Sequence, residues 1–233
     1  TTAANNTAVG TDALNDNTTG EYNTAVGAYS LDANTTTSNN TAIGYAAMGA
    51  NTAGYSVAAV GTNALASNTT GAQTNAMGHG ALGANTTGNF NNAFGYNALA
   101  TATTVSNNTA MGHNALTANT TGTLNTAFGS KAVDALTTGS NNTGIGAEAL
   151  TSATTCDYNT AVGQNALKDA TTGSDNNAFG RQALANNTTT NSNCAFGSVA
   201  LFTQTDGGTK NCAFGNSTLY SNTTGDSNCA FGD

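Results

Sequence analysis

Apolar and polar residues follow a pattern that repeats every 17 residues along the chain. The phrase Ala-Φ-Gly, in which Φ is Val, Ile, Met or Phe, ends at Gly10, again at Gly27, and for the last time at Gly232. Every step is 17 residues long except the 18-residue step between Gly197 and Gly215. The full unit reads Asn-Thr-Ala-Φ-Gly-x-x-Ala-Leu-x-x-Asn-Thr-Thr-Gly-x-x. Self-similarity at a fixed short period indicates a stacked repeat architecture.

The fixed positions of the unit indicate how it packs, and we count them from the Gly of Ala-Φ-Gly. Four positions are apolar: Ala at −2, where Gly144 is an exception, Φ at −1, Ala at +3 and Leu at +4. Thr stands at +8 in every unit, and Asn recurs at −4 and +7. If the units stack at the β-ladder spacing of about 4.8 Å, each position becomes a ladder of identical side chains. Ladders of Asn or Thr can form hydrogen bonds, whereas ladders of like charge would repel.

The unit predicts short strands instead of helices. It is too short for the helix pairs of α-repeats, which need roughly 33 residues, and its Gly, Thr and Asn each cost a helix up to about 1 kcal/mol relative to Ala. Extended segments of about four or five residues, separated by Gly and Asn turns, fit the pattern. The sequence therefore predicts an all-β parallel β-solenoid with 17 residues per coil and about 13 coils, in a single array over residues 1–233. The one-residue insertion falls in the turn-type residues 206–210.

The apolar pairs also bear on assembly. Adjacent residues of a strand point to opposite faces, so the pairs Ala-Φ and Ala-Leu would place apolar atoms on both faces of two strands in each coil. One face would fill the coil interior, and the other would need a partner. The pattern therefore predicts a homo-oligomer.

Composition and charge exclude several classes of function. Only 7% of the residues are charged, the net charge is −8, and the four Lys and Arg residues are scattered. Nucleic-acid binding, which needs a basic patch, is not expected. No apolar run approaches the roughly 18 to 20 residues that cross a bilayer, so no membrane insertion is expected in this segment. Because the chain starts and stops within a unit, we expect an interior slice of a longer fibre.

Three of the four cysteines, Cys194, Cys212 and Cys229, share position −3. Stacking would put neighbouring Cα atoms about 4.8 Å apart, inside the disulfide range of roughly 4.4 to 6.8 Å, so one bridge could form. The alternative that we favour is that these cysteines are small buried substitutes for Thr on the face shared with Φ. Cys156 occupies a turn position that Gly usually holds and has no evident partner. No Cys-x-x-Cys pair or Cys/His cluster predicts a metal site.

Catalytic chemistry is equally absent from the pattern. His79 and His113 are two coils apart, hence about 10 Å, which is too far to bind one ion. A metal ion bound at a trimer axis by three copies of one His is a less favoured alternative. No Ser/His/Asp or Cys/His grouping gives a nucleophile its base. We therefore expect no enzymatic activity, no catalytic residue and no cofactor.

Binding residues are expected at the positions that the repeat leaves free, one and two after Gly and five before it. Aromatic side chains there could stack on sugar rings or anchor a protein interface. Scattered surface aromatics can also lack any role. The candidate surface contacts are Tyr22, Tyr45, His79, Phe90, Tyr96, His113 and Tyr158.

The phrase Asn-Thr-Ala-Φ-Gly-x-x-Ala-Leu, as in Asn6-Thr7-Ala8-Val9-Gly10 with Ala13-Leu14, resembles the head repeats of YadA-type trimeric autotransporter adhesins. It is more similar still to the repeats of phage tail-fibre-like proteins, which Asn40-Thr41-Ala42-Ile43-Gly44-Tyr45 matches almost residue for residue. The resemblance covers the whole chain and implies a left-handed parallel β-roll, three chains side by side, and an adhesive or receptor-binding shaft. It also implies a place on a cell or virion surface. The adhesin heads repeat at a shorter interval, so strand lengths and trimer contacts can differ.

The leading functional hypothesis is thus the structural and adhesive shaft of an extracellular fibre, a phage tail fibre or a cell-surface adhesin, with a host glycan or protein receptor as lateral partner. One alternative is a self-assembling extracellular filament or sheath. Another is an ice-binding solenoid, because the Thr column is regular and uncharged. Against ice binding, we expect consecutive Thr residues to point to opposite faces and leave only one per face.

Overall fold

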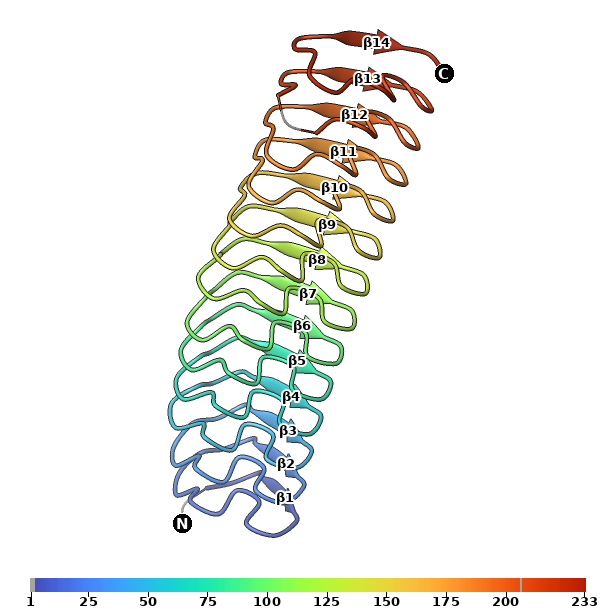
Figure 1. Ribbon diagram of the computed structural model, residues 1–233. Coiled ribbons are helices and arrows are strands. Elements are labelled where there is room, and N and C mark those ends of the chain that lie inside the picture. Colours follow the sequence, from blue (N-terminus) through green and yellow to red (C-terminus); the bar gives the residue numbers. More distant parts are fainter. Residues whose placement is uncertain (1–2, 206) are drawn as a thin grey trace. The chain divides into compact units, whose positions relative to one another are not determined.

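The computed structural model describes residues 3–205 and 207–233, and its regular secondary structure consists of one three-residue strand in each coil (Figure 1). Each strand covers positions −3 to −1 of the repeat. The strands are β1 (Thr7–Val9), β2 (Thr24–Val26), β3 (Thr41–Ile43), β4 (Ala58–Val60), β5 (Asn75–Met77), β6 (Asn92–Phe94), β7 (Thr109–Met111), β8 (Thr126–Phe128), β9 (Thr143–Ile145), β10 (Thr160–Val162), β11 (Asn177–Phe179), β12 (Cys194–Phe196), β13 (Cys212–Phe214) and β14 (Cys229–Phe231).

All fourteen strands belong to one sheet, in the order of the sequence. Neighbouring strands are parallel and pair identical repeat positions, as Ala8 does with Ala25 and Ala161 with Ala178. This register confirms the predicted parallel β-solenoid with a 17-residue period. The chain divides into two compact units, Thr1–Asn114 and Ala115–Asp233, and both are built from the same repeat.

The predicted second strand of each coil is wrong. The Ala-Leu segment forms a turn, in which the Leu at +4 adopts a left-handed backbone, with φ of 54° at Leu99 and 49° at Leu167. A left-handed residue reverses the alternation of side chains, so Ala98 and Leu99 both face the interior and are fully buried. The strands are also shorter than the four or five residues expected, because turns occupy the rest of each coil.

Of the two apolar pairs, only Ala-Φ places one apolar side chain in the coil interior and the other on the outer face of the strand. Ala93 is fully buried inside the coil, whereas Phe94 next to it is half-buried on the outer face of β6. The expected outward apolar surface therefore exists on one strand per coil and not on two.

Stacked Leu side chains at +4 and Ala side chains at −2 and +3 fill the interior. A left-handed backbone costs a residue other than Gly roughly 1–2 kcal/mol. Full burial of a Leu side chain contributes about 1.5–3 kcal/mol. Burial therefore offsets the backbone strain in each coil, which explains why an unfavourable turn can recur.

Packing explains why Gly144 replaces the usual Ala at position −2. A Cβ built on Gly144 would lie 2.5 Å from Cγ2 of Val133, which replaces Leu at +4 of the preceding coil. Val133 has a φ of 55°, a conformation that is especially unfavourable for a β-branched residue. The two departures from the repeat thus compensate for each other.

We expect Gly144→Ala alone to lower the free energy of unfolding by roughly 1–3 kcal/mol, because the new methyl overpacks the core against Val133. In a Val133→Leu background, which restores the usual pair, the same change should be close to neutral. A double-mutant cycle by urea denaturation measures this coupling, expected at about 0.5–3 kcal/mol. Strictly additive effects would refute the compensation.

The coil with 18 residues absorbs its extra residue with a longer side chain. In other coils the Asn at +7 donates its amide to the carbonyl three residues on, as Asn68 does to Gly71 at 2.9 Å. Gln204 replaces this Asn, and its Nε2 donates to the carbonyl of Gly208, four residues on. The additional methylene spans the additional residue. Of the predicted insertion segment 206–210, residue 206 lies outside the described residues. The hydrogen bond from Asn193 Nδ2 to the carbonyl of Gly208 spans 15 residues, one more than the equivalent bond from Asn176 to Thr190.

Candidate functional surface

Function has to be sought on the surface, because the described residues form no pocket. Within the same residues, no group of three or more His, Cys, Asp or Glu side chains could hold a metal ion. No helix that could cross a membrane occurs in the described part of the chain. The surfaces that remain are the rows of side chains that the stacked coils present outward.

The largest apolar feature is the row of Φ side chains on the outer face of the sheet, which we call the Φ stripe. Met77 in the first unit and Phe128 in the second are 51% and 52% exposed, so they are not covered by their own chain. The Φ stripe comprises Val9, Val26, Ile43, Val60, Met77, Phe94 and Met111 in the first unit, and Phe128, Ile145, Val162, Phe179, Phe196, Phe214 and Phe231 in the second.

Four phenylalanines of the Φ stripe stack on one another in strands β11 to β14. The ring centroids of Phe179 and Phe196 are 4.6 Å apart, and the next two steps, to Phe214 and to Phe231, are each 5.0 Å. The rings are nearly parallel, with interplanar angles of 4° to 7°. Because each ring face contacts its neighbour, the ring edges face outward.

The structure brings three of the seven candidate contacts together. Tyr96 stacks between His79 and His113, with centroid distances of 5.3 Å on both sides, and all three are exposed. The predicted distance of about 10 Å between the two histidines holds, and a Tyr ring fills the space. Tyr45 instead meets Tyr29, edge to face, at 5.9 Å.

The other three candidates, Tyr22, Phe90 and Tyr158, are exposed at position +12, where the backbone has positive φ. They lie several coils apart. None of them has a ring contact with another aromatic side chain in the part of the chain that the structure describes. The structure therefore assembles one aromatic row and leaves these three as separate exposed rings.

The invariant Thr at +8 has a role that the sequence reasoning missed. Its hydroxyl donates to the main-chain carbonyl of the same Thr in the next coil, as from Thr154 to Thr171 at 3.0 Å and from Thr171 to Thr188 at 3.1 Å. This bond joins the coils at a turn. Thr171 is half-buried and Thr172 exposed, and neither enters the core. Because the hydroxyl hydrogen of the Thr at +8 already donates to a main-chain carbonyl, this column is not an array of free hydroxyl groups.

The two Asn columns form buried ladders of different kinds. At +7 the amides bond side chain to side chain, as predicted, for example Asn68 Nδ2 to Asn51 Oδ1 at 3.0 Å. At −4 they bond mainly to the backbone. Asn159 Nδ2 donates to the carbonyl of Gly173 at 2.8 Å, and its Oδ1 accepts from the N–H of Asn176 at 2.9 Å. The Asn side chains of both columns therefore satisfy the hydrogen-bonding groups of the interior and are not placed to bind a ligand.

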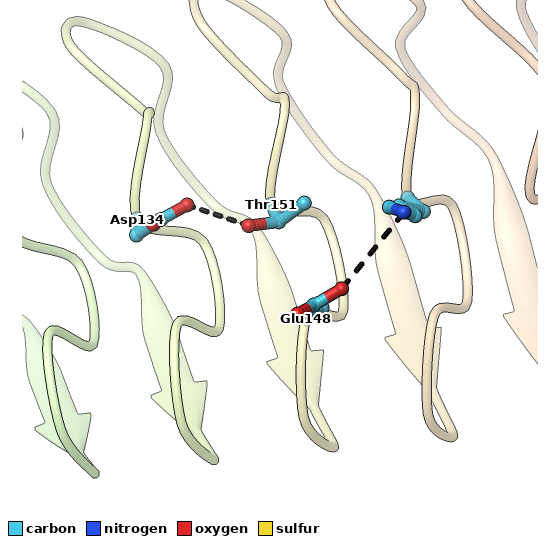
Figure 2. A network of polar contacts seen from close by, with 4 residues as sticks. Asp134, Glu148 and Thr151 are labelled. Carbon is cyan, nitrogen blue, oxygen red and sulfur yellow. Dashed lines mark hydrogen bonds and ion pairs between the residues drawn. The ribbon is translucent and has the colours of Figure 1, made fainter.

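Charged side chains do not gather into a site. In the described residues the one ion pair joins Lys168 Nζ to Glu148 Oε2 at 3.9 Å, beside a 2.6 Å hydrogen bond from Thr151 to Asp134 (Figure 2). Lys168 and Glu148 are about half exposed (42% and 44%), and exposed pairs contribute little, about 0–1 kcal/mol. The contacts in Figure 2 join side chains of neighbouring coils and do not form a catalytic or metal-binding site.

The cysteines at −3 are not buried, contrary to our expectation. Cys194 and Cys212 are half-buried and Cys229 is exposed, because position −3 lies on the outer face with the Φ stripe. All three thiols are free. Cys156 is also free but fully buried, and burial raises the pKa of its thiol to about 11. At neutral pH that thiol is protonated and unreactive.

In comparisons with known proteins, no family model and no characterised protein matches this chain.

Proposed function

We propose that this chain is a segment of a structural and adhesive shaft of an extracellular fibre, in which copies of the chain pack against one another through the Φ stripe. The observation that carries the proposal is the Φ stripe itself, one outward-facing apolar side chain in each coil, which is exposed in some coils, such as Met77 and Phe128, and half-buried in the others. Exposed apolar patches of this extent mark interaction surfaces in soluble proteins.

Another copy of the chain is the partner that suits the Φ stripe. The stripe repeats once per coil at the spacing of a β-ladder, about 4.8 Å. A second stripe with the same spacing can interdigitate with it over many coils, whereas an unrelated surface would match only a few side chains. No Φ position carries a charge, so the packing of one stripe on another brings no like charges together within the stripes. Three copies are favoured by the resemblance to trimeric adhesin heads.

Surface location and lateral binding follow as parts of the same proposal. A shaft that carries adhesion would stand on a cell or virion surface, and its receptor, a host glycan or protein, would meet side chains outside the Φ stripe. The row of His79, Tyr96 and His113 is the best placed of the candidates, because its exposed ring edges carry hydrogen-bonding groups.

Phe128→Lys tests the contact between copies. Phe128 is 52% exposed, so the change should leave the isolated coil folded, yet it would bury a charge between copies. We expect the dissociation constant of the oligomer to rise at least about tenfold, which is about 1.4 kcal/mol. Light scattering coupled to size exclusion measures the mass.

Leu124→Lys is the matched control, because Leu124 is 56% exposed and apolar but lies outside the Φ stripe. It should keep the mass of the wild-type chain, and circular dichroism should show both variants folded. Equal effects of the two variants, or none, would sink the proposed interface.

A self-assembling filament is the second candidate, since the same stripe could support open-ended lateral growth. A shaft gives one discrete mass at all protein concentrations above its dissociation constant. A filament gives a mass that keeps rising with concentration.

A further inference from the structure

The three cysteines on the outer face form a ladder of thiols, which we call the thiol ladder. Cys194 pairs in register with Cys212, and Cys212 with Cys229, on the adjacent parallel strands β12, β13 and β14. None of the three side chains is fully buried. Cys212 is therefore the middle member, shared by two neighbouring pairs.

The spacing of the thiol ladder does not suit a disulfide. In register, Cβ atoms repeat at the same distance as the coils, about 4.8 Å, whereas a disulfide needs Cβ atoms roughly 3.5–4.5 Å apart. The rings of Phe196 and Phe214, on the same two strands as Cys194 and Cys212, are 5.0 Å apart and support this spacing. A bond would have to pull two coils together against the rest of the stack.

The same spacing suits two sulfur atoms on either side of one ion. Metal–sulfur bonds of a d10 ion such as Zn²⁺ are about 2.3 Å long, so two opposed bonds span about 4.6 Å. Soft d10 ions of the Cu(I) class prefer thiolates and accept two opposed ligands, which a tetrahedral Zn²⁺ site does not. Among the described residues no group of three or more His, Cys, Asp or Glu side chains could hold an ion, so each pair of neighbouring thiols offers two ligands.

We propose that the thiol ladder binds soft d10 cations, Cu(I) or Ag(I), between neighbouring thiols, with Cys212 as the ligand common to both pairs. Two thiols and one monovalent ion give a bis-thiolate complex of charge −1 and release two protons, so no oxidant or reductant is needed. Because binding releases two protons, it becomes tighter as the pH rises. This proposal does not rest on the proposed function.

The test uses Ag(I), which is stable in air, with the full 233-residue chain in its native assembly state. Native mass spectrometry counts the ions, and ultraviolet sulfur-to-metal charge-transfer absorption follows the titration. Excess N-acetylcysteine competes away ions that are held by a single thiol. We expect the wild-type chain to retain at least one Ag(I) per chain under this competition.

Cys212→Ser separates the proposal from general thiol binding. It leaves Cys194 and Cys229 two coils apart, about 10 Å, so affinity should fall at least tenfold. Cys156→Ser, which removes the buried cysteine, should bind as wild type does. Loss of all Ag(I) from the wild type under competition, or wild-type affinity in Cys212→Ser, would overturn the proposal. Circular dichroism of each Ser variant separates loss of the site from loss of the fold.

Discussion

Gly78→Ala should lower the free energy of unfolding by roughly 3 kcal/mol or more. Gly78 has a φ of 134°, and an added Cβ would lie 2.4 Å from the carbonyl oxygen of Gly95 in the next coil. Such a backbone is essentially restricted to Gly and costs other residues about 1–3 kcal/mol, to which the clash with main-chain atoms adds. Thermal and urea unfolding measure the loss, and a fall in the melting temperature of about 6 °C or more is expected.

Gly83→Ala is the matched control, because it adds the same methyl in the same coil. Gly83 has no positive φ, its nearest contact would be 3.2 Å, and other coils carry Ala66 or Ala100 at the equivalent position. We expect its stability to stay within about 1 kcal/mol of wild type. If Gly78→Ala were as stable as Gly83→Ala, close approach of the coils at this glycine would be disproved.

Asn159→Ala should be the second most damaging change, at roughly 2–5 kcal/mol. Asn159 is fully buried, and its loss leaves two main-chain groups without their partners: the carbonyl of Gly173 and the N–H of Asn176. Each buried polar group left unsatisfied costs about 1–3 kcal/mol. Urea denaturation followed by circular dichroism gives the change, and hydrogen exchange should show lost protection at Asn176.

Thr172→Ala serves as the control for that variant, since Thr172 is exposed in the neighbouring turn. Its expected effect is within about 0.5 kcal/mol. An Asn159→Ala chain that unfolds at the same urea concentration as Thr172→Ala would show that the Asn ladder at −4 contributes no stability.

The period of the sequence was enough to predict the stacking, because a parallel ladder places each residue on its own copy in the next coil. That argument needed only the 17-residue spacing of the glycines. It could not predict that Leu99 adopts a left-handed backbone, since Leu has no local preference for it. Burial in the stacked coils imposes that conformation, and burial is a property of the assembled fold.

Other details had signals that sequence reasoning could have used. Gln204 stands where most other coils carry Asn, in the one coil that is a residue longer, and the structure shows that the two departures belong together. Gly144 likewise follows the only Val at +4. For the cysteines at −3, strand alternation predicted the face that they share with Φ, but the sequence did not show that their own chain leaves this face partly uncovered.

The surface could be predicted in part. The variable positions of the repeat predicted which aromatic side chains are exposed. The period alone did not predict which of these rings stack on one another. His79, Tyr96 and His113 stack because they occupy one position in three consecutive coils, whereas Tyr22 and Phe90 share a position four coils apart.

The proposed packing of copies requires the Φ stripe to be covered by other copies of the chain, so the mass of the protein in solution tests it most directly. Sedimentation equilibrium of the wild-type chain over a wide concentration range is the measurement. We expect one discrete species at three times the chain mass of 22.9 kDa. A monomer that persists at high concentration would show that the Φ stripe is not an interface between copies.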